Sequence, residues 1–143
     1  MDGARITRIT VVMDGDEVCI RCSGEIDLVA APRLRTAVDV ALELGTLCWI
    51  DLRNIDFIDS SGIHQLLYAQ RQAVIRSACL LIAPARTTAV MRPFELLGLM
   101  ERLPFAFRAP RPQRRGRFTR HRISRHVDGI PVLVTTDAHQ GRP

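Results

Sequence analysis

A short buried strand that is followed by a helix is the feature that most constrains this fold. Residues 47–52, Leu-Cys-Trp-Ile-Asp-Leu, form an apolar run between Gly45 and Asn54. Such a run is typical of a strand that is buried on both faces and paired in parallel, with helices covering the sheet. Residues 61–75 follow as a predicted helix, whose expected inner stripe is Ile63, Leu66, Leu67 and Val74. The sequence therefore predicts an α/β layer.

The N-terminal part supplies a hairpin and a first helix. Residues 8–13 and 18–26 are rich in β-branched side chains and are separated by D-G-D, which predicts a hairpin. After Pro32, a residue suited to a helix's first turn, residues 34–42 carry apolar side chains at i, i+3, i+4, i+7 and i+8. This periodicity predicts an amphipathic helix that ends at Gly45.

The following segments complete the predicted layer. Residues 78–82 read as another buried strand and residues 87–97 as a third helix, in which Pro93 should cause a kink or leave two short turns. Residues 102–107 are expected to add a last strand. The predicted fold is a mixed sheet of four to five strands, opened by the hairpin, with the helices mainly on one face.

The chain changes character at residue 108. The segment before it carries 11 Arg against 13 Asp and Glu, whereas residues 108–143 carry 9 Arg against 2 Asp. This second segment is rich in arginine and proline and lacks apolar periodicity, so we expect a flexible basic tail. Residues 130–136 have strand character, which Pro131 would confine to a sheet edge. The predicted organisation is a domain over residues 5–107 followed by this C-terminal extension.

The basic extension raises the question of nucleic-acid binding. Arginines neutralise phosphates, but Phe118 is the only aromatic side chain beyond Phe107, so stacking on bases is nearly absent. A solvated tail is therefore favoured over contact with an acidic protein surface or with nucleic acid.

Other composition features exclude several classes of protein. No run approaches the ~18 apolar residues that a bilayer requires, and the N-terminus lacks a signal peptide's apolar stretch, so we expect a cytoplasmic protein without membrane insertion. Cys19 and Cys22 form C-x-x-C, but strand alternation places them on opposite faces. Cys48 and Cys79 lie in apolar runs, where a thiol packs as a small hydrophobe. No metal or cofactor is expected.

The most distinctive motif is I-D-F-I-D-S-S-G-I at residues 55–63, where the buried strand meets the helix. The first turn of a helix has N–H groups without partners and a partial positive charge. A phosphate on Ser60 or Ser61 could be held by these amides, and Gly62 keeps the backbone approachable. Phosphorylation would add about −1.5 to −2 charges beside the two aspartates of the motif. The motif thus suggests a phosphorylation switch.

Two simpler interpretations compete with the switch. Ser60 or Ser61 could merely cap the helix, which is a common role of serine. Alternatively Ser61 could be a nucleophile with His64, one turn later, as its base. The sequence disfavours this enzymatic interpretation, because it has no G-x-S-x-G elbow and no obvious carboxylate to orient His64. We therefore do not expect an enzyme.

Three sequence elements resemble the STAS domain of bacterial anti-sigma factor antagonists, over about residues 5–107. They are G-E-I-D at residues 24–27, I-D-L-R-N-I-D-F-I-D-S-S-G-I at residues 50–63, and an A-P pair followed by a helix ending L-L-G-L at residues 96–99. The chain departs from the family in its basic, proline-rich segment from Arg108, where the family's domain has a further helix.

The resemblance implies a partner-switching role. The unphosphorylated protein would bind an anti-sigma factor that is also a serine kinase and so free a sigma factor; phosphorylation would abolish binding, and a serine phosphatase could restore it. The phosphoacceptor maps onto Ser61, with Ser60 as the alternative, and the partner-binding residues onto Asp27, Asp59, Ser60, Ser61 and Gly62. Other STAS roles remain as alternatives: a subunit of an ABC-type lipid transport system, or a ligand-sensing or redox-sensing module.

Overall fold

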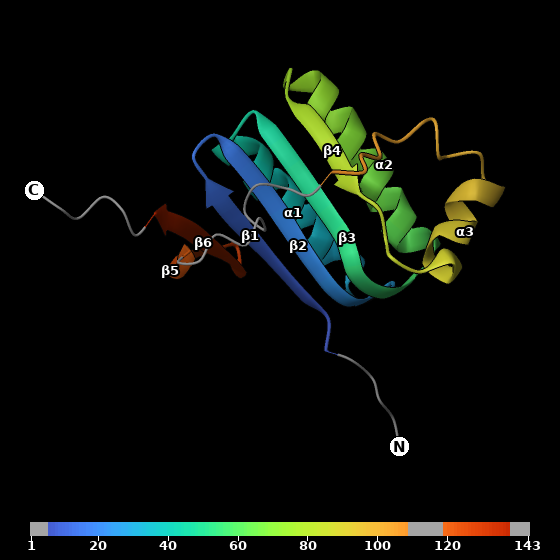
Figure 1. Cartoon of the computed structure of the whole chain (residues 1–143), viewed down its shortest axis with the longest axis horizontal. Helices are drawn as coiled ribbons and strands as arrows, with labels where there is room; N and C mark the ends of the chain where they lie inside the picture. Colours follow the sequence, from blue (N-terminus) through green and yellow to red (C-terminus); the bar gives the residue numbers. More distant parts are fainter. Residues whose placement is uncertain (1–5, 109–118, 138–143) are drawn as a thin grey trace, which may run out of the picture.

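Six strands form one mixed sheet in the order β4-β3-β2-β1-β6-β5 in the computed structural model, which describes residues 6–108 and 119–137 (Figure 1). The β1–β2 and β5–β6 pairs are antiparallel, and the other three pairs are parallel. The elements in chain order are β1 (Arg8–Asp14), β2 (Glu17–Ile26), α1 (Ala31–Leu44), β3 (Leu47–Ile58), α2 (Ser60–Ile75), β4 (Cys79–Ala83), α3 (Thr88–Leu96), β5 (Thr119–Val127) and β6 (Ile130–Asp137).

The N-terminal predictions are confirmed. The hairpin is present as β1 and β2, and α1 begins with Pro32 in its first turn. All five predicted apolar positions of α1 are buried, namely Leu34, Ala37, Val38, Ala41 and Leu42. The helix packs against β1, β2 and α2, on the far side of the sheet in Figure 1. This face holds the main hydrophobic core.

The opposite face of the sheet carries a second, smaller core. Cys19, Trp49 and Ala83 are buried there, with Leu81 and Ala106 packed against them. Cys22 belongs to the main core, so the predicted separation of the two C-x-x-C cysteines onto opposite faces is confirmed. Strand β3 is also longer than predicted and continues to Ile58.

The inner stripe of α2 was only partly predicted. Ile63 and Leu66 are buried, but Val74 is exposed. The stripe is instead completed by the small residues Gly62, Ala69 and Ala73. At about 100° per residue, Val74 lies roughly 90° from the centre of this stripe. The prediction for Val74 is wrong because small side chains, which let the helix approach the sheet, were not counted as core.

Two C-terminal elements of the predicted domain also differ. Residues 102–107 do not form a strand, because only Phe105 bridges to Ile82 in β4. Ile82 N–H donates to the Pro104 carbonyl and Ala106 N–H donates to the Ile82 carbonyl, both at 2.9 Å. Pro93 does not divide α3 into two turns either. A nine-residue helix tolerates it, since a proline removes one backbone hydrogen bond.

Most of the expected tail is ordered into a hairpin. Strand β6 pairs in parallel with β1, starting at Val11 and Val132, and β5 pairs with β6 at the sheet edge. The expectation of an unstructured segment is therefore wrong for residues 119–137, because Ile130 and Val132 are buried in the main core. Strand β6 is not an edge strand, and its ladder with β1 begins just after Pro131. Residues 109–118 and 138–143 lie outside the described residues.

Candidate functional site

Two of the predicted site residues, Asp27 and Asp59, lie side by side at the end of the sheet. Asp27 follows the last residue of β2 and Asp59 follows the last residue of β3, and these last residues, Ile26 and Ile58, are partners in the parallel ladder. The Asp59 N–H also donates to the Ile26 carbonyl at 3.2 Å. Parallel pairing therefore places both carboxylates at equivalent positions of neighbouring strands.

Asp27 shapes the loop between β2 and α1. Its Oδ1 accepts hydrogen bonds from the N–H groups of Val29 at 3.1 Å and Ala30 at 3.0 Å. The loop holds two apolar side chains outward, since Leu28 is 73% and Val29 is 82% exposed. Leu28 and Val29 thus form a small apolar surface on this loop.

Asp59, and not a serine, caps α2. Its Oδ1 accepts hydrogen bonds from the N–H groups of Ser61 at 2.8 Å and Gly62 at 3.1 Å. The interpretation of Ser60 or Ser61 as the capping residue is therefore wrong. The first-turn amides expected to hold a phosphate are also occupied by a carboxylate, so a phosphate added here would meet a fixed negative charge.

We expect Asp59→Ala to destabilise the protein by about 1 kcal/mol, since it leaves two first-turn amides without their acceptor. Urea unfolding followed by circular dichroism measures this change. Asp59→Asn is the matched control, because asparagine caps helices about as well as aspartate. An equal loss of stability in both variants would contradict the capping role.

Gly62 is buried because α2 starts very close to the sheet. A Cβ atom at this position would lie 2.6 Å from Ile58 Cγ1, 2.8 Å from Ile26 Cγ2 and 2.9 Å from the Ile26 carbonyl oxygen. These separations are shorter than side chains tolerate in a packed core. The glycine therefore serves the approach of helix to strand, not the approach of a ligand that the sequence suggested.

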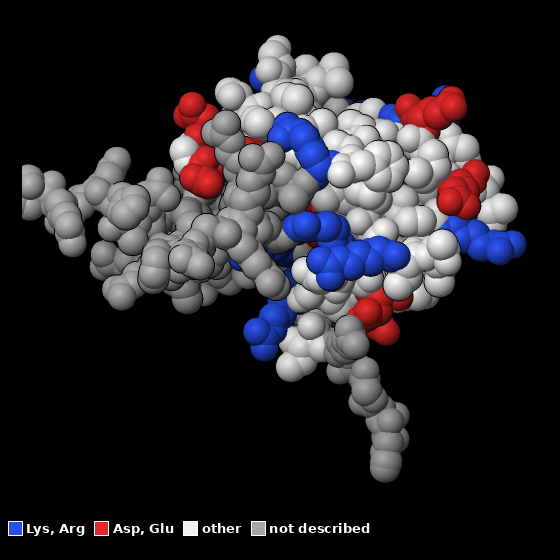
Figure 2. Space-filling view, in the orientation of Figure 1, with Lys and Arg blue, Asp and Glu red and all other residues white. Residues whose placement is uncertain are grey.

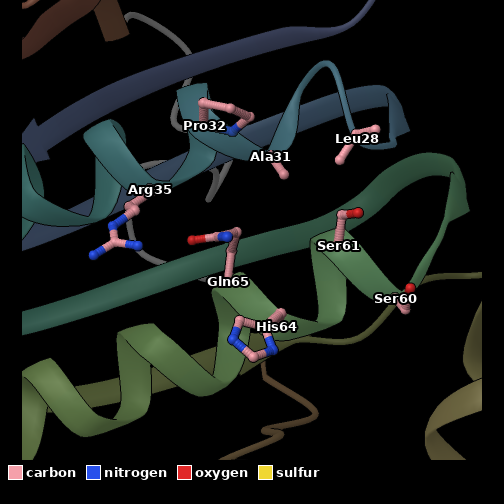
Figure 3. A pocket seen from close by; sticks show the side chains of 8 residues that line it. All are labelled: Leu28, Ala31, Pro32, Arg35, Ser60, Ser61, His64 and Gln65. Atoms are coloured by element: carbon pink, nitrogen blue, oxygen red, sulfur yellow. The ribbon is translucent and has the colours of Figure 1, made fainter.

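The serine hydroxyls border an open pocket of about 580 Å³ between α1 and α2 (Figure 3). Ser60 is exposed and Ser61 is half-buried. In Figure 3 the Ser61 side chain projects from α2 into the space facing the loop that carries Leu28. The lining residues are Leu28, Ala31, Pro32, Arg35, Ser60, Ser61, His64 and Gln65. Ser61 is therefore within reach from outside the molecule.

Arg35 is the basic residue of this pocket that the sequence did not single out. Its Cζ lies 4.1 Å from the centre of the Tyr68 ring on α2. The Tyr68 hydroxyl donates to Asp39 at 2.7 Å, and this hydrogen bond raises the pKa of Tyr68. The three side chains hold α1 against α2, and in Figure 3 the Arg35 guanidinium lies at the end of the pocket away from Ser60 and Ser61. No local pattern in the sequence reports this packing of α1 on α2.

His64 lies in the same pocket, but it is not placed as a catalytic base. A serine nucleophile needs its base within hydrogen-bond reach. In residues 6–108 no hydrogen bond joins His64 to Ser61, and Figure 3 shows the imidazole directed away from the Ser61 hydroxyl. The described part of the site therefore contains no assembled nucleophile and base.

Three of the four cysteines are buried as expected, but Cys79 is exposed, so the expectation that its thiol packs as a small hydrophobe is wrong. Cys19, Cys22 and Cys48 are buried, and burial raises the pKa of the Cys19 and Cys22 thiols and that of Cys48 to about 11. Protonated thiols are poor nucleophiles and poor metal ligands. Among the described residues, no group of three or more His, Cys, Asp or Glu side chains could hold a metal ion.

No helix in the described ranges is both long and apolar enough to span a bilayer.

Fold and site together define a class of small α/β domain: a mixed sheet whose central strands end in two backbone-binding aspartates and present two serines at the start of a helix. Residues 8–108 match the STAS domain, and the chain belongs to the STAS domain family. The match ends before the β5–β6 hairpin. The expected STAS-like fold is thereby confirmed, although the sheet has six strands and not four to five.

Solved structures similar to this chain include anti-sigma factor antagonists. One from Mycobacterium paratuberculosis is 26% identical, covers 72% of this chain and 87% of its own, and has a TM-score of 0.64. SpoIIAA in its unphosphorylated form is 23% identical over 68% of this chain and 87% of its own, with a TM-score of 0.58. The Bacillus cell fate determinant SpoIIAA in the phosphorylated form is 22% identical over 68% of this chain and 90% of its own, with a TM-score of 0.54. The two SpoIIAA structures support the fold alone.

Proposed function

We propose that this protein is an anti-sigma factor antagonist that phosphorylation of Ser61 switches off. In its unphosphorylated form it binds an anti-sigma factor with serine kinase activity, which releases a sigma factor. A serine phosphatase restores the binding form. The protein acts as a binding partner and has no catalytic activity of its own.

The observation that carries this proposal is the half-buried Ser61 hydroxyl at the rim of an open pocket. Within residues 6–108 neither this hydroxyl nor that of Ser60 serves the helix cap, because Asp59 does so. The Ser61 side chain is thus accessible to a kinase, while the backbone around it is held by the hydrogen bonds to Asp59. The similarity to an anti-sigma factor antagonist of 26% identity supports the same role.

The surroundings of Ser61 favour a charge-operated switch. Leu28 and Val29 offer an apolar contact beside the serine, and a partner resting on them would cover the pocket. A phosphate on Ser61 would carry about −1.5 to −2 charges close to the Asp59 carboxylate, whose position is fixed by two amide bonds. Under a partner the repulsion is poorly screened, so binding is lost without unfolding of the domain.

The test is phosphate transfer to the full chain. The protein is incubated with ATP and anti-sigma factor kinases of its own organism, and the modified peptides are mapped by mass spectrometry. We expect one phosphate on the wild type and on Ser60→Ala, and none on Ser61→Ala. A phosphate on Ser61→Ala would contradict the assignment to Ser61. So would a result in which Ser60→Ala is the only variant without a phosphate.

A further inference from the structure

A second pocket lies on the face of the sheet opposite α1, and it is strongly basic. It has a volume of about 270 Å³, and its lining includes three arginines and no acidic residue. The lining residues are Arg53, Ala83, Pro84, Ala85, Arg86, Ala106, Phe107 and Arg108. Figure 2 shows basic side chains gathered in the middle of this face, over β2 and β3. None of these residues belongs to the Ser61 pocket.

The first arginine, Arg53, is held rigidly by Asp51. Arg53 Nε lies 3.0 Å from Asp51 Oδ1 and Arg53 Nη2 lies 3.1 Å from Asp51 Oδ2, while the Arg53 backbone N–H donates to Oδ1 at 3.1 Å. Asp51 is buried and the Arg53 side chain is 21% exposed, so the pair is partly shielded from water. This two-point contact uses two of the five N–H donors of the guanidinium. Asp51 thus positions Arg53 and leaves donors to serve a ligand.

The second arginine, Arg108, is held by an aromatic ring. Its Cζ lies 4.9 Å from the centre of the Trp49 ring, a distance typical of a cation–π contact. Trp49 is buried, and its indole N–H donates to the Glu17 carboxylate. Glu17 therefore holds the Trp49 ring in place, and the ring in turn positions the Arg108 guanidinium.

The third arginine, Arg86, adds charge from the loop between β4 and α3. Asp51 neutralises the charge of Arg53. The pocket therefore keeps a net charge of about +2, which comes from Arg86 and Arg108. The loop follows the carboxyl end of β4, and ligands of open α/β sheets bind at the carboxyl ends of parallel strands. Preset guanidinium groups are suited to phosphate, whose oxygens accept paired N–H donors.

We propose that this basic pocket binds a small ligand that carries one or two phosphate groups. Its volume lies just below the usual range of ligand pockets, so it suits an inorganic phosphate or pyrophosphate, or the phosphate part of a nucleotide. The site does not depend on Ser61 or on an anti-sigma factor. It is a second binding function on the opposite face of the sheet.

The test is isothermal titration of the full chain with inorganic phosphate, pyrophosphate and ADP, at constant ionic strength with chloride as the reference anion. We expect saturable binding of at least one of them, and a loss of at least about fivefold in affinity in Arg86→Gln and in Arg108→Gln. Arg71→Gln is the matched control, because Arg71 is an exposed arginine of α2 that lines neither pocket. Its affinity should stay within about twofold of the wild type. Binding of ADP but not of the inorganic ions would identify a nucleotide as the source of the phosphate.

Trp49 provides a second measurement, since it is the only tryptophan of the chain and lies beneath Arg108. Its fluorescence should change saturably with the same affinity as the titration. The proposal is overturned if no phosphate compound binds more tightly than chloride. It is also overturned if Arg71→Gln weakens binding as much as Arg86→Gln, since the attraction would then come from the overall charge.

Discussion

Ser61→Asp is expected to bind the cognate anti-sigma factor at least about tenfold more weakly than Ser61→Ala, because a loss of about 1.4 kcal/mol suffices for this factor. Two unit charges about 4 Å apart repel by roughly 4 kcal/mol at an effective dielectric constant of 20. The Asp59 carboxylate is held in place by the amides of Ser61 and Gly62, so it cannot turn away easily. Titration calorimetry with the purified partner measures the effect.

The matched control for this experiment is Ser77→Asp. Ser77 is exposed just after the far end of α2 and has a φ of 54°, a conformation that aspartate tolerates. The variant adds the same charge far from the pocket, so its affinity should equal that of the wild type. Phosphorylated wild type should bind more weakly still, since a phosphate carries more charge than a carboxylate. Equal affinities of Ser61→Asp and Ser61→Ala would refute the switch.

Phe94→Ala is expected to destabilise the protein by about 3–5 kcal/mol, the usual cost of removing a fully buried phenylalanine side chain. Phe94 in α3 is 0% exposed and packs edge-to-face on Phe105, with ring centres 5.3 Å apart. It therefore links α3 to the segment that bridges to β4. Because small domains are stable by about 5–15 kcal/mol, this one change removes a large part of the total.

The control for this prediction is the same substitution at an exposed position. Phe107 is 87% exposed, so Phe107→Ala should change the free energy of unfolding by no more than about 0.5 kcal/mol. Urea denaturation of both variants gives the comparison. A loss below about 1 kcal/mol in Phe94→Ala would show that α3 is not part of the cooperative core.

The elements that the sequence predicted correctly are those defined by local periodicity. The first helix has five apolar positions at helical spacing, and all five are buried. The opening hairpin has two strands rich in β-branched residues around a D-G-D turn. The turn is short enough that the two strands pair with each other in antiparallel fashion. Local patterns failed where small residues form the contact surface, as with Gly62, Ala69 and Ala73 in α2.

The C-terminal hairpin could not be predicted as part of the sheet, because its partner β1 lies more than a hundred residues earlier in the chain. Segment 119–127 contains three arginines and two histidines, so it has no apolar alternation. One local signal was overlooked: Asp128 and Gly129 form a D-G turn with positive φ angles of 50° and 81°.

The sequence indicated which residues form the candidate site, but it did not indicate most of the contacts between them. The motif led to Ser60, Ser61 and Asp59, and parallel pairing places Asp27 beside them. The capping role of Asp59 was missed, although aspartate before a helix is a strong capping signal. The contribution of Arg35 depends on how α1 packs on α2, and a sequence pattern does not report such packing.

The docking of β6 beside β1 also changes which strand forms the outer border of the sheet. A border strand offers unpaired N–H and C=O groups on which further chains can polymerise, and charged residues are a common protection against this. The apolar β1 is shielded, and the border passes to β5, whose sequence contains three arginines. The hairpin thereby moves this border of the sheet from an apolar strand to a strand of basic sequence.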